Sequence, residues 1–294
     1  MSYQQQYLPY GNDSGSSPGQ VISGIVIVVM IFIVALVGEV LYKSVYETKG
    51  RYKTLIDYTA ASDDGTITIH QDESKYSDAK EIKFSVNERT GIEFSYSFFI
   101  YVNSSTIQGP ENGGSANKFY HVFHKGYETL WPLMGPGVFI NSTNVDGSTL
   151  MRVVMNTYKN PFTYADIKGF PLNKWFHVVL NCYNNGIDIF INGDLKNRIP
   201  FTDTLPYQNF QDLVLFYKGG AITLNGTSGP SVLGSGNNIV LTSGFNGKIS
   251  NLVYTRYALS ITEIQNIMQK GVSSQVSAKV TDSIASLSPE WTGR

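Results

Sequence analysis

The chain has 294 residues, a formal net charge of −1 and a single cysteine. Because the charge is nearly balanced and the basic residues are scattered, no surface is predicted to attract nucleic acid. Cys182 has no partner for an intrachain disulfide, which is typical of a reducing compartment and argues against a secreted adhesive module. The 19 Tyr, 16 Phe and 28 Gly residues favour sheets joined by turns.

The N-terminal region combines a polar tail with a long apolar stretch. Residues 1–20 are polar and lack hydrophobic periodicity, so we expect a flexible tail. Residues 21–38 carry no charge, and a helix of that length spans roughly 27 Å, close to the hydrocarbon thickness of a bilayer. About thirteen Val, Ile, Leu and Phe side chains favour insertion by roughly 4–8 kcal/mol. We therefore expect a transmembrane helix over 21–42, anchored by Val21, Ile25, Val29, Phe32, Leu36 and Tyr42.

The charges beside this span predict its orientation. Lys43, Lys49, Arg51 and Lys53 follow the span, and no Lys or Arg precedes it. The positive-inside rule therefore places the C-terminal part of the chain on the cytosolic side during synthesis. A cleaved signal peptide is the less favoured interpretation, because signal peptides begin with a basic region and have a shorter apolar core. Residues 43–65 are expected to form a juxtamembrane connector.

From residue 66 the pattern becomes that of β-strands. In the long run 92–102, Phe94, Tyr96 and Phe98 alternate with Ser95 and Ser97, so the two sets are expected on opposite faces. Further strands are expected at 66–70, 81–86, 118–126, 138–140, 148–158, 175–183, 187–195, 213–217 and 244–258.

Turn and cap residues close this region. Asn184–Gly186 and Asn192–Gly193 predict two hairpin turns in succession. Ser260 and Glu263 have the spacing of a capping box, and Gly271 suits a C-terminal cap, so a short helix is expected between them. In the arm 272–294, apolar residues recur every three or four positions, which predicts a weak amphipathic helix or a docking arm.

Two segments resemble the laminin-G-like domains of the concanavalin A-like superfamily. They are Trp175-Phe-His177-Val178, followed by Asp188-Ile-Phe-Ile191-Asn192-Gly193-Asp-Leu195, and the closing Phe245-Asn-Gly247-Lys-Ile249. The resemblance implies an all-β jelly-roll sandwich, which we expect over 66–271. In this family His177 has a structural position, and we expect Trp175 to be buried beside it and to begin the inner-face alternation.

Two further segments resemble a subgroup of these domains found in large DNA viruses of algae and amoebae. They are Ser85-Val-Asn87-Glu88 with Gly91-Ile-Glu93-Phe94-Ser-Tyr, and His121-Val-Phe-His124-Lys125-Gly126. This resemblance implies a virion structural protein, located between an internal viral membrane and the capsid. Its expected partners are the lipid bilayer and other shell proteins. The residues expected to contact such partners are Trp131, Val276, Val280, Ile284 and Trp291.

The chain lacks the side chains that catalysis in this superfamily needs. Glucanases of this fold carry two glutamates around an aspartate on one strand, whereas Asp188 is flanked by Gly186 and Phe190. His121 and His124 are three positions apart, so on a regular strand they face opposite ways and cannot share a metal. We therefore expect no enzyme, no metal and no cofactor.

Two binding alternatives remain at this stage. Turn formation is the favoured interpretation of Asp63, Asp64, Asn144 and Asp146, with a calcium site at the rim of the sandwich as the alternative. The favoured function is a membrane-anchored structural protein, a minor capsid component. The alternative is a membrane-anchored lectin that binds glycans. The lectin is less favoured because extracellular domains of this family usually carry a disulfide and a signal peptide.

Overall fold

The computed structural model describes residues 18–85, 92–107, 118–128, 130, 132–141, 148–160, 162–217, 222–224 and 239–277. The chain divides into two units, of which one ends at Gly50 and the other begins at Arg51. Most of the tail expected over 1–20 lies outside the described residues.

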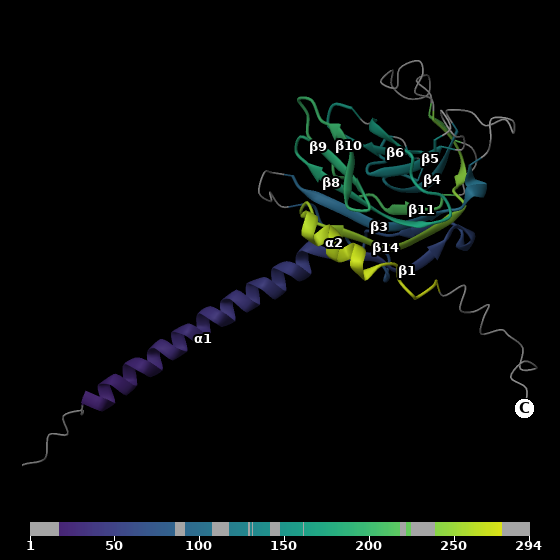
Figure 1. Ribbon diagram of the computed structural model, residues 1–294. Coiled ribbons are helices and arrows are strands. Elements are labelled where there is room, and N and C mark those ends of the chain that lie inside the picture. The colour runs from purple at the N-terminus through teal and green to yellow at the C-terminus, as the bar shows by residue number, and fades with distance from the viewer. Residues whose placement is uncertain are drawn as a thin grey trace, which may run out of the picture. The chain divides into compact units, whose positions relative to one another are not determined.

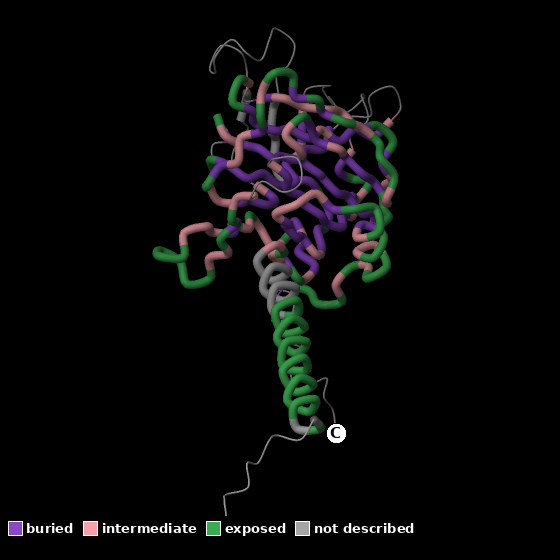
Figure 2. Tube along the Cα trace, turned by 90° about the vertical axis from the view of Figure 1, so that its left-hand side faces the viewer, coloured by how far each residue is buried: buried purple, intermediate pink, exposed green. Residues whose placement is uncertain are grey.

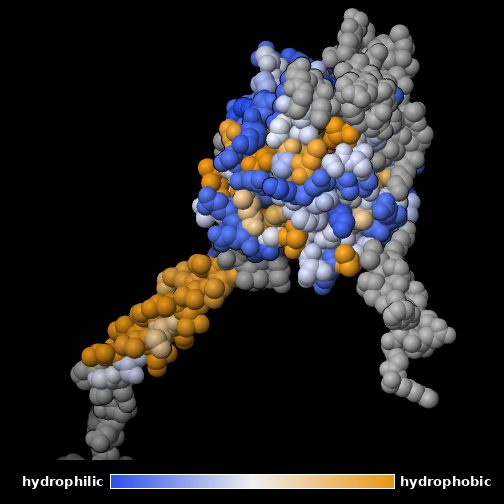
Figure 3. Space-filling model, turned by 45° about the vertical axis from the view of Figure 1, so that its right-hand side comes forward, coloured by the Kyte–Doolittle hydropathy of each residue, from blue (hydrophilic) through white to orange (hydrophobic). Residues whose placement is uncertain are grey.

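The first unit contains one long helix, α1 (Pro18–Arg51), shown in Figure 1. Its segment Val21–Leu41 has a mean hydropathy of 3.1, and every side chain from 21 to 41 is exposed (Figure 2). Figure 3 shows an apolar surface along the visible side of the helix, and its side chains from 21 to 38 carry no charge, as in a helix that is apolar all round. The helix is long and apolar enough to cross a membrane, and a signal sequence passes the same test.

The segment expected as a connector is mostly regular structure. Helix α1 continues to Arg51, because residues 43–49 contain no Gly or Pro that would end it. Strand β1 (Tyr52–Ala61) then begins at the next residue and forms the edge of a sheet. The structure therefore differs from the expected connector over 43–65 and leaves no irregular residue between α1 and β1.

The described residues of the second unit form two sheets. The first has six antiparallel strands in the order β1-β14-β3-β8-β9-β10. Its remaining strands are β3 (Phe94–Val102), β8 (Trp175–Tyr183), β9 (Gly186–Ile191), β10 (Asp194–Pro200) and β14 (Gly247–Thr255).

The second sheet has eight strands, with the main order β12-β13-β4-β5-β6-β7 and with β11 joining β4 to β2. All of its described pairs are antiparallel except β13 with β4. Its strands are β2 (Ile67–Ile69), β4 (Lys118–Lys125), β5 (Gly137–Asn141), β6 (Leu150–Met155), β7 (Thr163–Lys168), β11 (Leu213–Leu215), β12 (Ile222–Leu224) and β13 (Ile239–Gly244).

The main core lies between the two sheets. Phe94, Tyr96 and Phe98 of β3 point into it, as the alternation predicted, and Cys182 of β8 is buried in it. The short helix α2 (Ile261–Lys270) packs Ile264 on the outer face of the six-stranded sheet, and its Ser260–Glu263 capping box and Gly271 cap are confirmed. The fold is the expected all-β sandwich with an N-terminal apolar helix and a short C-terminal helix.

The expectation for Trp175 is wrong. Phe176, not Trp175, begins the inner-face alternation of β8, so Trp175 is half-buried on the outer face, where its ring lies 5.7 Å from that of Tyr101. The pattern alone did not fix the phase, because almost every residue of β8 is apolar or aromatic on both faces.

Residues 81–85 do not form the expected strand. Side chains, rather than a neighbouring strand, satisfy their backbone: Tyr254 donates to the Lys83 carbonyl at 2.8 Å, and Arg256 donates to the Phe84 carbonyl at 2.8 Å. The Ile82 amide donates to the Gln71 side chain at 2.8 Å. An alternating pattern here therefore reflects one buried face, not a place in a sheet.

Candidate binding pocket between the sheets

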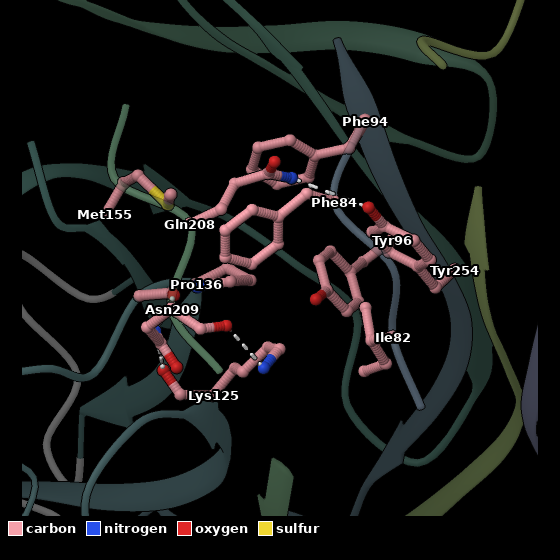
Figure 4. A pocket seen from close by; sticks show the side chains of 11 residues that line it. Ile82, Phe84, Phe94, Tyr96, Lys125, Pro136, Met155, Gln208, Asn209 and Tyr254 are labelled. Carbon is pink, nitrogen blue, oxygen red and sulfur yellow. Dashed lines mark hydrogen bonds between the residues drawn. The ribbon is translucent and has the colours of Figure 1, made fainter. Parts of the chain in front are cut away.

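A small pocket, of about 230 Å³ with its open solvent included, lies among side chains from both sheets and from three irregular segments (Figure 4). Strand β3 and strand β14 contribute Phe94, Tyr96 and Tyr254 from one sheet, and the other sheet contributes Lys125 at the end of β4. The remaining lining residues are Ile82, Phe84, Gly135, Pro136, Met155, Gln208 and Asn209.

Lys125 is the charged side chain of this pocket. It is only 4% exposed, and its ammonium donates to the carbonyls of Asn209 at 2.8 Å and Gln211 at 2.6 Å. The side-chain amide of Asn209 in turn donates to the Lys125 carbonyl at 3.0 Å and the Gly135 carbonyl at 3.1 Å. These bonds clamp the segment before β11 against β4. Burial lowers the pKa of Lys125 to about 7, while the nearby charge of Asp212 acts in the opposite direction.

Two tyrosines from the six-stranded sheet line the pocket, and their hydroxyls point in different directions. Tyr96 is 2% exposed, and Figure 4 shows its hydroxyl pointing into the pocket. The Tyr254 hydroxyl instead donates to the Lys83 carbonyl and accepts a long, 3.5 Å hydrogen bond from Gln208. Burial raises the pKa of both phenols, so both remain neutral donors at physiological pH.

Exposed aromatic rings lie beside the pocket. Phe210 is 74% exposed and stacks on the pocket residue Phe84, with 4.0 Å between ring centroids. Tyr158 is 68% exposed and meets Tyr207 edge-on at 5.1 Å. Phe210 and Tyr207 belong to the same segment as Gln208 and Asn209, so this segment joins the pocket to an aromatic surface.

The expectation that His121 and His124 face opposite ways is wrong. A register shift between His121 and Phe123 in the β4–β5 pairing inserts one extra residue, and both imidazoles therefore point to the outer face. His121 Nε2 lies 2.7 Å from His124 Nδ1, and His124 Nε2 lies 2.8 Å from the Tyr127 carbonyl. The Tyr217 amide donates to His121 Nδ1 at 3.0 Å. Each ring nitrogen thus has a hydrogen-bond partner, and burial lowers the pKa of both histidines.

His177 forms a second buried imidazole contact, with Ser97. The His177 Nε2 and Ser97 Oγ atoms are 2.8 Å apart, a distance at which a base can hydrogen-bond a nucleophilic hydroxyl. Both residues are only 1% exposed, and His177 Nδ1 has no hydrogen-bond partner among the described residues. A substrate has no access to this pair, so its arrangement is that of a buried packing contact, in which the His177 ring lies against Phe99.

Two carboxylates that were candidates for catalysis or calcium binding, Asp188 and Asp64, form contacts with nearby side chains and backbone. Asp188 lies 3.0 Å from Arg198, and burial raises its pKa. Asp64 accepts hydrogen bonds from the Ala61 amide at 3.0 Å and the Ser277 hydroxyl at 2.7 Å. Within the described part of the chain, no group of three or more His, Cys, Asp or Glu side chains is arranged to hold a metal. Asn144 and Asp146 lie outside that part.

The structure places the remaining predicted site residues as follows. Asn192 and Gly193 form the tight turn between β9 and β10, with φ of 51° and 83°. Phe245 is buried, and Gly247 opens β14. Val276 is 45% exposed and pairs through its backbone with Thr59 of β1. The other expected contact residues, Trp131, Val280, Ile284 and Trp291, lie outside the described residues.

Sequence reasoning missed the pocket itself. The available signal was Lys125, a charged residue at the end of the apolar run 119–123. On a regular strand Lys125 would share a face with His121, but the bulge turns it toward the core. No sequence pattern pointed to the other side of the pocket, because its residues Gln208, Asn209 and Phe210 lie in an irregular segment.

No family model and no curated protein sequence matches the chain. Among solved structures, the ligand-binding domain of botulinum neurotoxin serotype D, in complex with N-acetylneuraminic acid, matches at 14% identity and a TM-score of 0.39, over 65% of this chain and 39% of that one. The binding domain of Paraclostridial Mosquitocidal Protein 1 matches at 14% identity and a TM-score of 0.42, over 74% of this chain and 46% of that one. The chain spans less than half the length of these structures, and likeness at this level carries no argument about its function.

Proposed function

We propose that this chain is a membrane-anchored structural protein that binds other proteins at a membrane surface. The observation that supports this proposal is the direct succession of α1 and β1, in which Arg51 ends the helix and Tyr52 begins the first strand. When the helix crosses a bilayer, no irregular linker separates the sandwich from it. Such a domain is confined to the membrane surface and to whatever is stacked directly on that surface.

A finer proposal is that the protein is a minor capsid component, which links an internal viral membrane to the shell. It is supported by the resemblance of 85–96 and 121–126 to a subgroup from large DNA viruses. Two surfaces are available for shell proteins: the exposed aromatic rings of Tyr158 and Phe210, and the arm beyond α2, whose described apolar residues Val272 and Val276 are exposed. Trp131, Val280, Ile284 and Trp291 remain proposed contacts.

The experiment is to purify particles and map cross-links in them by mass spectrometry. We expect the chain in the particle, in a membrane fraction that resists carbonate extraction, with cross-links from lysines of the sandwich to shell proteins. A chain that is absent from particles would contradict the capsid role. A chain that resists carbonate extraction in cells but is absent from particles would leave only the broader membrane proposal.

A membrane-anchored lectin is the second candidate, and one observation favours it. Tyr158 and Phe210 present exposed aromatic rings, which are suited to stacking on sugar rings. Binding of the purified full chain to a glycan array, lost in a Tyr158→Ser and Phe210→Ser double variant, would favour the lectin. Unchanged binding in that variant would remove the observation on which the lectin proposal rests.

A further inference from the structure

Protonated Lys125 is a buried cation without a carboxylate in hydrogen-bond contact, among the residues that the structure describes. Its two acceptors are backbone carbonyls. The nearest acidic influence, Asp212, directs its two oxygens to His70 at 2.8 Å and to the Gln71 amide at 2.9 Å. A buried charge is costly unless it is paired, so most lysines this deep have a counter-charge.

The pocket offers a second hydrogen-bond donor to an anion that enters it. A lysine ammonium has three N–H groups, and the two carbonyls use two of them. Figure 4 shows the amine and the Tyr96 hydroxyl directed toward the same space, from opposite sheets. A carboxylate placed between them would accept one hydrogen bond from each, and both bonds would be stronger for the charge. The clamp made by Asn209 would stay intact.

The size of the pocket restricts what can carry that carboxylate. Ligand sites for whole small molecules usually enclose about 300–1,000 Å³. The space here is far smaller, because the value of about 230 Å³ counts all atom-free space among the lining side chains, including open solvent. It suits a single acidic side chain that enters from outside, with the rest of the ligand remaining at the surface.

The surroundings of the pocket favour a polypeptide as the source of that side chain. Phe84 lines the pocket and carries Phe210 stacked on its outer side, so an apolar ring pair stands next to the buried charge. Protein interfaces concentrate binding energy in a desolvated anchor that is surrounded by apolar contacts which exclude water. A buried lysine beside exposed aromatic rings has this arrangement.

We propose that the pocket of Lys125 and Tyr96 binds the carboxylate of a Glu or Asp side chain on a partner polypeptide, with Phe84 and Phe210 covering the flanking residues of that partner. The inference deepens the proposed function, because it names the chemistry of the partner that an interaction domain would bind. It does not depend on whether the partner belongs to a capsid.

The test uses the full chain in detergent micelles, with ¹³C-labelled lysine, and follows the Lys125 side-chain signal by NMR. The probes are blocked glutamate (N-acetyl-glutamate N-methylamide), the corresponding blocked glutamine, and acetate. We expect blocked glutamate to shift the Lys125 signal saturably at millimolar concentration, and blocked glutamine to bind at least about tenfold more weakly, since it lacks the charge. Acetate should bind more weakly than blocked glutamate, because it has no backbone to contact the rings.

Variants separate the site from the fold. Tyr96→Phe keeps the lysine clamp and should weaken blocked glutamate by about tenfold, the value of one hydrogen bond to a charged group. Phe210→Ser should weaken blocked glutamate but not acetate. Lys80→Met is the control, because the Lys80 ammonium also donates to a backbone carbonyl, that of Leu55 at 2.6 Å, but does not line the pocket. It should leave binding unchanged.

Two results would overturn the inference. The first is no saturable shift of the Lys125 signal with any carboxylate probe, in a chain whose thermal unfolding is normal. The second is acetate binding as tightly as blocked glutamate, which would assign the pocket to a small carboxylate rather than to a polypeptide. Neither result bears on the location of the chain, which the particle and membrane experiments test separately.

Discussion

Gly247 shows how closely the chain packs at a single residue. A Cβ atom at this position would lie 2.1 Å from the Tyr101 carbonyl oxygen and 2.2 Å from the Phe245 ring. The backbone of Tyr101 lies within the sheet and cannot move away from such a contact as the end of a flexible side chain can. The glycine of the closing segment 245–249 is therefore required by the close approach of β14 to β3.

We expect Gly247→Ala to destabilise the protein by about 3 kcal/mol, at the upper end of the cost of overpacking. Gly169→Ala is the matched control. A Cβ at Gly169 would meet nothing within 4 Å, but the φ of this residue is 79°. The substitution should therefore lower the free energy of unfolding only by the cost of placing alanine in the left-handed region, about 1–2 kcal/mol. Urea denaturation of both variants measures the difference. Equal losses would show that the contact at Gly247 is relieved by a small backbone shift.

The buried imidazoles predict how stability changes with pH. Burial lowers the pKa of His124 and of His177 to about 4, and it lowers the pKa of His121 as well. In the unfolded chain these groups bind protons near pH 6.5, so below that pH the unfolded state binds more protons than the folded state. Their contribution to stability is present above pH 6.5 and is lost as the pH falls through about 4.

We expect the free energy of unfolding to fall between pH 6.5 and 4.5, by up to about 1.4 kcal/mol per pH unit for each buried histidine. Urea titrations at a series of pH values measure this slope. His177→Gln should reduce the slope by the contribution of one histidine. A slope that is the same in His177→Gln and the parent would contradict the assignment.

At the scale of elements, the C-terminal arm protects the edge of the six-stranded sheet. The Thr59 amide donates to the Gln275 carbonyl at 2.7 Å, and the Ser277 amide donates to the Thr59 carbonyl at 3.2 Å. The Lys80 ammonium covers the Leu55 carbonyl of the same strand. Edge strands with open backbone groups pair with other chains, so these contacts limit association through β1.

Truncation tests this role of the arm. A chain that ends after Gly271 should lose about 4–5 kcal/mol, because five hydrogen bonds of Ser273, Gln275 and Ser277 to the rest of the sandwich are worth about 1 kcal/mol each. It should also associate more strongly, as measured by light scattering in detergent. A chain that ends after Ser277 keeps these bonds and should behave as the parent. Association of both truncated chains to the same degree would place the protective contact beyond residue 277.

The elements that could be predicted are those whose local chemistry agrees with their place in the fold. The hairpins around Asn184–Gly186 and Asn192–Gly193 follow from turn residues, and α2 follows from its capping box. Strand β7 and strand β1 were missed because polar, half-exposed edge positions dilute their alternation.

The candidate site was less predictable than the fold, because it depends on long-range events. The bulge in β4 reverses the faces of His124 and Lys125, and no turn residue marks it in the sequence. The pocket also needs Gln208 and Asn209, which are brought there by hydrogen bonds to Ser85 and Lys125. Only the register of the two sheets brings these groups together.

At the scale of the whole molecule, the orientation of the chain in the membrane can be tested directly. The cationic residues after α1's apolar segment predict that the sandwich faces the cytosol during synthesis. Protease added to intact microsomes should therefore digest the sandwich and spare the segment Val21–Leu41. Full protection of the sandwich, or glycans on Asn103 or Asn225, would reverse the orientation and favour the lectin.

The pairing of β1 with β14 also determines when the sandwich is completed on the ribosome. Thr59 and Ser250, which share a hydrogen bond across these strands, are 191 residues apart. At 5–20 residues per second, β1 waits roughly 10–40 s for β14 to be synthesised. During translation the first strand of the sandwich is thus unpaired and tied to a helix that has already emerged. A chaperone that shields strands in this interval should therefore raise the yield of folded protein.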